Sequence, residues 1–284
     1  MTTTLERPAR AVHTAATTTH RQTLGRAIRA EWIKIRTLRS TWIGMASIVT
    51  IMIGFGALAA AMSTGSVTGP QNGGGGGPFA GEGPLATVLT GANFAVLLIG
   101  VLGSLAGARE YSSRMITATV ATVPRRWQVV IAKTVALAAV VVPTALVSVT
   151  GAYAAGMGIL SANDSATAAL TDDGVLTSLL GMAGYLTAIA LLGLGLGSML
   201  RSVAGSIGTV VGGILILPTL AGALLPDSWD KILKFLPSSA ASSFTAVDTA
   251  GSSTLSAGAG VAVLAAWVVA VIAAAILVIR ARDV

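Results

Sequence analysis

Apolar residues are gathered into six long stretches that are separated by short polar or charged segments. A helix needs about 20 predominantly apolar residues to cross the hydrocarbon core of a bilayer. The pattern therefore predicts an all-α integral membrane protein with six transmembrane helices, in a domain that extends from residue 40 to residue 284. We expect the spans at about residues 41–62, 85–108, 129–157, 175–200, 203–225 and 257–279, with Pro143 as a kink in the third.

A different pattern precedes the first span. Between Leu24 and Leu38, apolar residues recur at helical spacing among basic residues, and Trp32 lies in the middle. An apolar stripe with a basic opposite face and a tryptophan is typical of a helix that lies in the membrane surface. We predict such an interfacial helix at residues 24–39, after a disordered cytoplasmic tail at residues 1–23. The alternative is that this segment only supplies positive charge before the first span.

The basic residues favour one orientation of the six spans. If the N-terminus is cytoplasmic, all of the 18 lysines and arginines except Lys231 and Lys234 lie in cytoplasmic segments. Most of the acidic residues lie on the other side. Because positively charged loops remain in the cytoplasm, the sequence predicts that both termini are cytoplasmic.

Composition supports the membrane assignment and excludes several kinds of chemistry. The chain is 54% hydrophobic and only 10% charged, whereas soluble domains carry about 25% charged residues. It has no cysteine, so thiolate metal sites and cysteine nucleophiles are excluded. A pI near 10.6 could indicate nucleic-acid binding. The charges lie beside apolar stretches, however, so we expect them to orient the chain, with no nucleic-acid partner.

The predicted spans carry almost nothing that ionises. They contain no Asp, Glu, Arg or His, and Lys133 lies near enough to a helix end for its ammonium to reach the surface. This argues against an ion-coupled transporter, a channel or an intramembrane enzyme. The glycine runs at 193–197 and 205–213 are predicted to be helix-packing faces. We expect no catalytic residue, cofactor site or metal site in this chain.

Two polar segments remain. The glycine-rich segment at residues 63–84 has no Lys-Ser or Lys-Thr pair after its glycines, so it is not a phosphate-binding loop and is interpreted as a flexible external linker. The basic loop at residues 109–128 reads REYSSRMITATVATVPRRWQ. It could hold the topology or bind a soluble partner. A short helix that carries Arg109, Glu110 and Arg114 would offer directional salt bridges to such a partner.

Three segments carry a resemblance to a known family. RAIRAEWIKIRTLRSTW at the start, AREYSSRMITATVATVPRRWQVVIAK in the middle and LLPDSW with FLPSSAASSF near the end resemble permease subunits of bacterial type-2 ATP-binding-cassette (ABC) exporters. The individual motifs are loose, but their order and spacing agree with the predicted topology. Together they cover the chain from about residue 24 to its end.

The resemblance implies a coupling site on the cytoplasmic side. In that family the loop after the second span forms a short helix that docks on the ATPase subunit. The corresponding residues here are Arg109, Glu110, Tyr111, Arg114, Pro124, Arg125 and Arg126. The interfacial helix, with Glu31, Trp32, Lys34 and Arg36, would lie beside it.

The same resemblance implies the partners. Two permease copies or homologues would form a dimer around a central path, in contact with membrane lipid. Two ATPase subunits would bind ATP and Mg²⁺ below them, and residues 226–244 would form a re-entrant external lid. The long loop at residues 63–84 departs from the family pattern, and its role is open.

The leading hypothesis is a non-enzymatic permease in a bacterial cell membrane. It would export a drug, a lipid or another amphiphile with ATP hydrolysed by a separate subunit. The alternative is a non-transporting membrane scaffold or sensor that binds a cytoplasmic protein through residues 109–128. The sequence does not identify the substrate, and the direction of transport comes from the resemblance alone.

Overall fold

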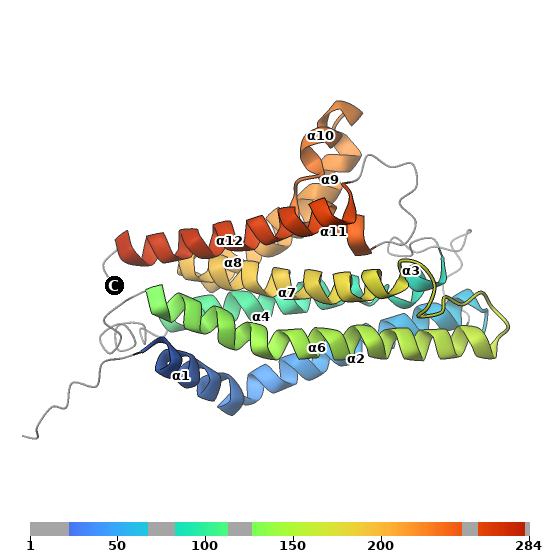
Figure 1. Ribbon diagram of the computed structural model, residues 1–284, viewed down its shortest axis with the longest axis horizontal. Helices are drawn as coiled ribbons and strands as arrows, with labels where there is room; N and C mark the ends of the chain where they lie inside the picture. Colours follow the sequence, from blue (N-terminus) through green and yellow to red (C-terminus); the bar gives the residue numbers. More distant parts are fainter. Residues whose placement is uncertain (1–22, 68–82, 113–126, 246–254, 282–284) are drawn as a thin grey trace, which may run out of the picture.

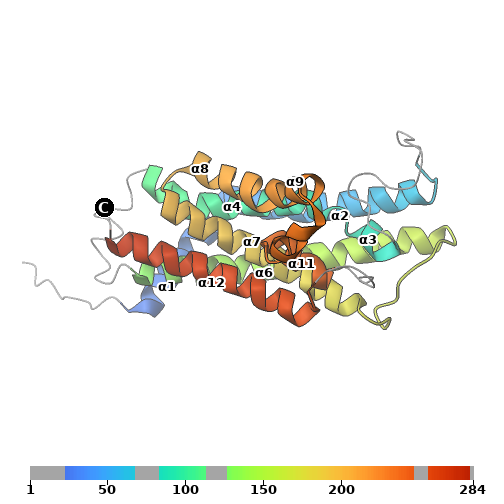
Figure 2. The same ribbon diagram turned by 90° about the horizontal axis from the view of Figure 1, so that it is seen from above.

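The computed structural model describes residues 23–67, 83–112, 127–245 and 255–281. Within these ranges the chain is helical, and six helical segments are long and apolar enough to cross a membrane. The predicted all-α membrane fold with six spans is therefore confirmed. The helices lie roughly side by side in one elongated bundle (Figures 1 and 2).

The helices of the first half are α1 (Leu24–Thr37), α2 (Arg39–Ser63), α3 (Pro84–Val88), α4 (Ala92–Ser112) and α6 (Trp127–Ala162). The second half has α7 (Val175–Leu200), α8 (Val203–Gly208), the π-helix η1 (Thr209–Ile216), α9 (Leu217–Leu224), the short 3₁₀ helix η2 (Asp227–Trp229), α10 (Asp230–Leu233), α11 (Pro237–Thr245) and α12 (Ala257–Ala281). The segments α8, η1 and α9 together make the fifth candidate span.

Two predicted spans differ from the observed helices. The second is broken into α3 and α4 between Leu89 and Gly91. At this break the backbone passes so close to α2 that a β-carbon on Gly91 would collide with the carbonyl oxygen of Met52. The third span, α6, has 36 residues and continues through Pro143 without interruption. At about 1.5 Å per residue it is much longer than the hydrocarbon core is thick, so part of it extends beyond the bilayer.

Helix α7 is the centre of the bundle. It packs against α4, α6, α11 and α12, and its side chains Leu186, Ile189, Leu192 and Leu194 are completely buried. The seam between α4 and α7 is formed by glycines. A β-carbon on Gly193 would lie 2.6 Å from the carbonyl oxygen of Gly100. The prediction that the glycines at 193–197 form a packing face is confirmed.

The second glycine run behaves differently. A β-carbon on Gly208 or Gly212 would meet no atom within 4 Å. The fifth span is also the least buried of the six, since only 11% of its most apolar 18-residue stretch is buried. Gly208 and Gly212 therefore do not pack against the described residues, whereas the completely buried Ser206 and Val210 of the same run face the bundle, where α8 and η1 contact α4 and α7.

Helix α1 lies at one end of the bundle, beside the start of α6 (Figure 1). Its last turn is closed by the Leu38 N–H, which donates to the carbonyl oxygen of Lys34, and Leu38 itself is extended. The chain therefore turns at Leu38 and enters α2 at Arg39. We call this end of the bundle, which carries Arg39, Arg109, Arg201 and Arg280, the basic end.

Candidate partner-binding site at the basic end of the bundle

The site predicted from the sequence belongs to the loop that joins α4 to α6. Helix α4 ends at Ser112 and α6 begins at Trp127, both at the basic end (Figure 1). Of the seven predicted coupling residues, Arg114, Pro124, Arg125 and Arg126 lie outside the described residues, as does the side chain of Glu110. The structure therefore defines the two helix ends that carry the loop.

A buried ion pair fixes the start of α6 to α1. The Lys133 ammonium donates to Glu31 Oε2 at 3.1 Å, and the Lys34 ammonium donates to Glu31 Oε1 at 2.8 Å. The side chains of Lys133 and Glu31 are only 10% and 9% exposed, whereas that of Lys34 is 41% exposed. Glu31 thus joins two elements that are 102 residues apart in the sequence.

The sequence prediction for Lys133 was wrong. Its ammonium does not reach the surface, because Glu31 holds it between α1 and α6. A buried charge is tolerated only when it is paired and hydrogen-bonded. Removing one member of a buried pair typically costs about 3–5 kcal/mol, since the other charge is left uncompensated. The Glu31–Lys133 pair therefore makes α1 a fixed part of the basic end.

The end of α4 is tied to its neighbours by two contacts. Arg109 Nη1 donates to Ser40 Oγ at 3.3 Å, which links α4 to the first turn of α2. The guanidinium of Arg201 lies over the ring of Tyr111, with its central carbon 5.2 Å from the ring centroid. A cation–π contact of this kind contributes about 0.5–2 kcal/mol. Both predicted residues, Arg109 and Tyr111, therefore connect α4 to other helices.

Arg201 occupies the turn between α7 and α8. Its backbone is left-handed, with φ 53° and ψ 17°, and its N–H donates to the carbonyl oxygen of Gly197. Ser202 then caps α8 by accepting a hydrogen bond from the Gly205 N–H at 3.2 Å. A non-glycine residue in this conformation is uncommon. Arg201 and Lys133 were not among the predicted site residues.

The predicted residues of the interfacial helix have different roles. Glu31 is buried and Lys34 pairs with it, whereas Trp32 and Arg36 are exposed. The carbonyl oxygen of Arg36 accepts a hydrogen bond from Trp42 Nε1 at 3.0 Å, so the indole of α2 is held against the end of α1. One face of α1 thus packs on the bundle, and the other carries tryptophan and arginine.

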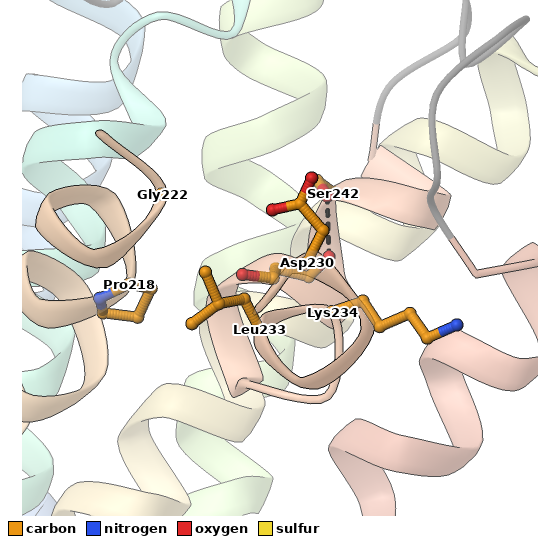
Figure 3. Close-up of a pocket in the computed structure, with 7 residues that line it drawn as sticks. Pro218, Gly222, Asp230, Leu233, Lys234 and Ser242 are labelled. Atoms are coloured by element: carbon orange, nitrogen blue, oxygen red, sulfur yellow. Dashed lines mark hydrogen bonds between the residues drawn. The ribbon is translucent and has the colours of Figure 1, made fainter. Parts of the chain in front are cut away.

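A second feature lies on the side of the bundle, where α9 and α10 project from it near α11 (Figure 1). A recess of about 230 Å³ lies between α9, α10 and α11, lined by Pro218, Leu233 and Ser242 among others. In Figure 3 Lys234 extends away from Pro218. Trp267 Nε1 donates to the carbonyl oxygen of Phe235 at 2.8 Å, which ties this segment to α12. Residues 226–244, the predicted lid, thus form the short helices η2 and α10 and most of α11, attached to the bundle.

In the described parts of the chain, no three His, Asp or Glu side chains are grouped so as to hold a metal ion. The charged side chains at the basic end instead join helices to each other. The basic end is therefore a rigid group of helix ends, and the loop between α4 and α6 joins two of them.

Comparison with known protein families gives a match. A family model described as "ABC-2 family transporter protein" matches residues 27–217. The matched region includes most of α1, the whole of α2, α4, α6 and α7, and the α7–α8 turn, whereas α12 with Arg280 lies beyond it. No curated protein sequence matches the chain.

Proposed function

Because the chain belongs to the ABC-2 transporter family and is a multi-pass permease subunit of an ABC transporter, we propose that a separate cytoplasmic ATPase subunit drives it. In this proposal the chain catalyses no reaction itself. ATP and Mg²⁺ bind in the ATPase, and the permease converts a movement of that subunit into a movement of its helices.

The observation that carries the proposal is the fixation of both ends of the loop at residues 113–126. The end of α4 is joined to α2 and to Arg201, and the start of α6 is joined to α1 by the buried Glu31–Lys133 pair. A partner that binds this loop and moves would exert a pull on α4 and α6 together. Since α4 packs on α7 and α6 packs on α2, the pull would reach four spans.

We assign the contact with the ATPase to Arg109, Glu110, Tyr111 and Arg114, followed by the turn Pro124–Arg126. Mixed charge on a short element provides directional salt bridges. The basic end then faces the cytoplasm, in agreement with the positive-inside distribution of Lys and Arg. Glu31, Trp32, Lys34 and Arg36 support the contact from α1.

A second permease copy or a homologue completes the transporter. The fifth span supports this part of the proposal, because Gly208, Gly212 and Gly222 leave open space where a β-carbon would be. Small residues allow helices in a membrane to approach closely. A dimer with this face at its centre would export a lipophilic cargo, such as a drug or a lipid, along a path between the copies.

Purification in mild detergent tests the ATPase assignment. We expect a nucleotide-hydrolysing subunit to copurify, and we expect Glu110→Ala and Arg114→Ala to leave the protein inserted while they uncouple ATP hydrolysis from transport. Lys231→Ala, on α10 and away from the basic end, is the matched control. Unaltered transport and ATPase stimulation in both loop variants would refute the coupling site. Absence of any ATPase would favour a non-transporting scaffold.

Disulfide cross-linking tests the dimer. The chain has no cysteine, so Gly212→Cys introduces the only thiol. We expect oxidation to yield a covalent dimer from Gly212→Cys and none from Gly184→Cys on α7, where a β-carbon also meets no atom. Equal cross-linking at both positions would count against the fifth span as the contact.

A further inference from the structure

A groove of about 430 Å³ opens on the outside of the bundle, where α1 and α2 meet α6. Its walls are Trp32 of α1, Trp42 and Val49 of α2, and Ala139, Pro143 and Val147 of α6, among others. Both tryptophans and Val147 are exposed, at 39%, 53% and 55%. In a membrane this groove therefore opens toward lipid.

The inside of the groove is suited to hydrocarbon. Its polar groups include the Thr144 hydroxyl, which donates to the carbonyl oxygen of Val140, and the Trp42 indole, which donates to that of Arg36. The remaining lining side chains, apart from the Trp32 indole N–H, are apolar. From Ala139 to Val147 the groove follows α6 for about 12 Å, at 1.5 Å per residue. This shape fits the upper part of an acyl chain.

The two tryptophans that line the groove have arginines one helical turn away on their own helices. Arg29 precedes Trp32 by three residues and Arg36 follows it by four, so the three side chains share one face of α1. Arg39 stands in the same relation to Trp42 on α2. All three arginines are exposed, and none forms an ion pair with a described residue.

Tryptophan is enriched at the level of the lipid headgroups, and arginines there attract anionic lipids. We propose that the groove binds one anionic membrane phospholipid. Its acyl chain lies between Trp32, Trp42 and Pro143, and its phosphate lies among Arg29, Arg36 and Arg39.

The site has a structural consequence. The groove lies between the corner at Leu38 and α6, and the Glu31–Lys133 pair holds α1 against the same helix. A lipid in the groove fills the space that α1 and α2 leave beside α6. The inference depends on the membrane location of the chain and not on its transport partner.

Native mass spectrometry of the full chain in mild detergent tests the site. The probes are a phosphatidylglycerol and a phosphatidylcholine with identical acyl chains, mixed in equal amounts. We expect the wild type to retain phosphatidylglycerol preferentially. The double variant Arg36→Gln/Arg39→Gln should lower this preference on the order of tenfold, because each basic residue near an anionic surface contributes to the attraction. Ala139→Leu, which fills the groove, should remove the bound lipid.

Matched controls separate the site from general effects of charge and volume. Arg280→Gln removes an exposed charge from the end of α12, and Ala154→Leu enlarges an exposed alanine of α6 beyond the groove. Both should bind lipid like the wild type. If Ala139→Leu does not fold, Ala46→Leu fills the groove from α2.

Three results would overturn the proposal. One is equal retention of the two lipids by the wild type. Another is wild-type lipid binding by both groove-filling variants. The third is a disulfide between two copies carrying Ala139→Cys, which would place a second chain in the groove.

Discussion

Glu31→Gln should release α1 from the bundle, and the structure gives the size of the effect. At 3.1 Å and an effective dielectric constant of about 20, the Lys133 and Glu31 charges attract each other by about 5 kcal/mol. Desolvation cancels part of this attraction. Removing the carboxylate breaks the pair that Glu31 forms with the Lys133 ammonium, which is 10% exposed, and breaking a buried pair typically costs about 3–5 kcal/mol.

The partners of Glu31 should not be equivalent. Lys133→Met leaves the carboxylate paired with Lys34 at 2.8 Å, so we expect the loss of one charged hydrogen bond, about 1.5–3 kcal/mol. Lys34→Met removes a side chain that is 41% exposed and screened by solvent, and it should cost about 0–1 kcal/mol. The predicted order of destabilisation is Glu31→Gln, then Lys133→Met, then Lys34→Met.

Thiol labelling measures this order directly. The chain has no cysteine, and Ala27 on α1 is 7% exposed, so Ala27→Cys reports each opening of α1. Since about 1.4 kcal/mol corresponds to a factor of ten, Glu31→Gln should accelerate labelling on the order of a hundredfold to a thousandfold. Ala30→Cys, which is exposed, should be labelled at one rate in every background.

Two results would refute the reasoning. If Glu31→Gln changed the labelling rate of Ala27→Cys by less than about threefold, the ion pair would not hold α1 in place. If Lys34→Met accelerated labelling as much as Lys133→Met, the buried contact with α6 would have no special role.

Two further predictions concern the packing of the bundle. Gly193→Ala should lower the thermal unfolding temperature in detergent, because its β-carbon would lie 2.6 Å from a backbone oxygen of α4 and overpacking costs about 1–3 kcal/mol. Gly184→Ala, which has open space around it, should leave the unfolding temperature unchanged. Equal effects of the two substitutions would contradict a tight seam between α4 and α7. A double-mutant cycle of Tyr111→Leu and Arg201→Gln, measured by unfolding in detergent, should give a coupling energy of about 0.5–2 kcal/mol. Tyr111→Phe keeps the aromatic ring, so its stability should equal that of the wild type. Additive effects of the first pair would show that the cation–π contact does not stabilise the basic end.

The spans could be predicted from sequence because the length of an apolar stretch directly reflects the thickness of the bilayer. The fourth span, residues 175–200, coincides with α7. The glycines at 193–197 also predicted a close contact between helices. The break at Leu89–Gly91 could not be predicted in this way, since it arises from the approach of another helix to Gly91.

The candidate site was only partly predictable. The basic loop and α1 could be identified from their charges, but the pairing of Glu31 with Lys133 depends on how the chain folds back over 102 residues. One signal was present in the sequence. Glu31 is the only acidic residue between positions 24 and 39, and Lys133 is the only charged residue within the predicted spans. Two isolated opposite charges of this kind are candidates for a buried pair.

Site-specific cross-linking in native membranes tests the central claim most directly. The cysteine-free chain allows a single thiol at Glu110→Cys in the loop, with Asp164→Cys beyond the opposite end of α6 as the control. We predict that a cross-linker joins residue 110, and not residue 164, to a polypeptide that hydrolyses ATP. Attachment of the ATPase at residue 164, or at neither position, would contradict the claim that energy enters this permease through the loop between α4 and α6.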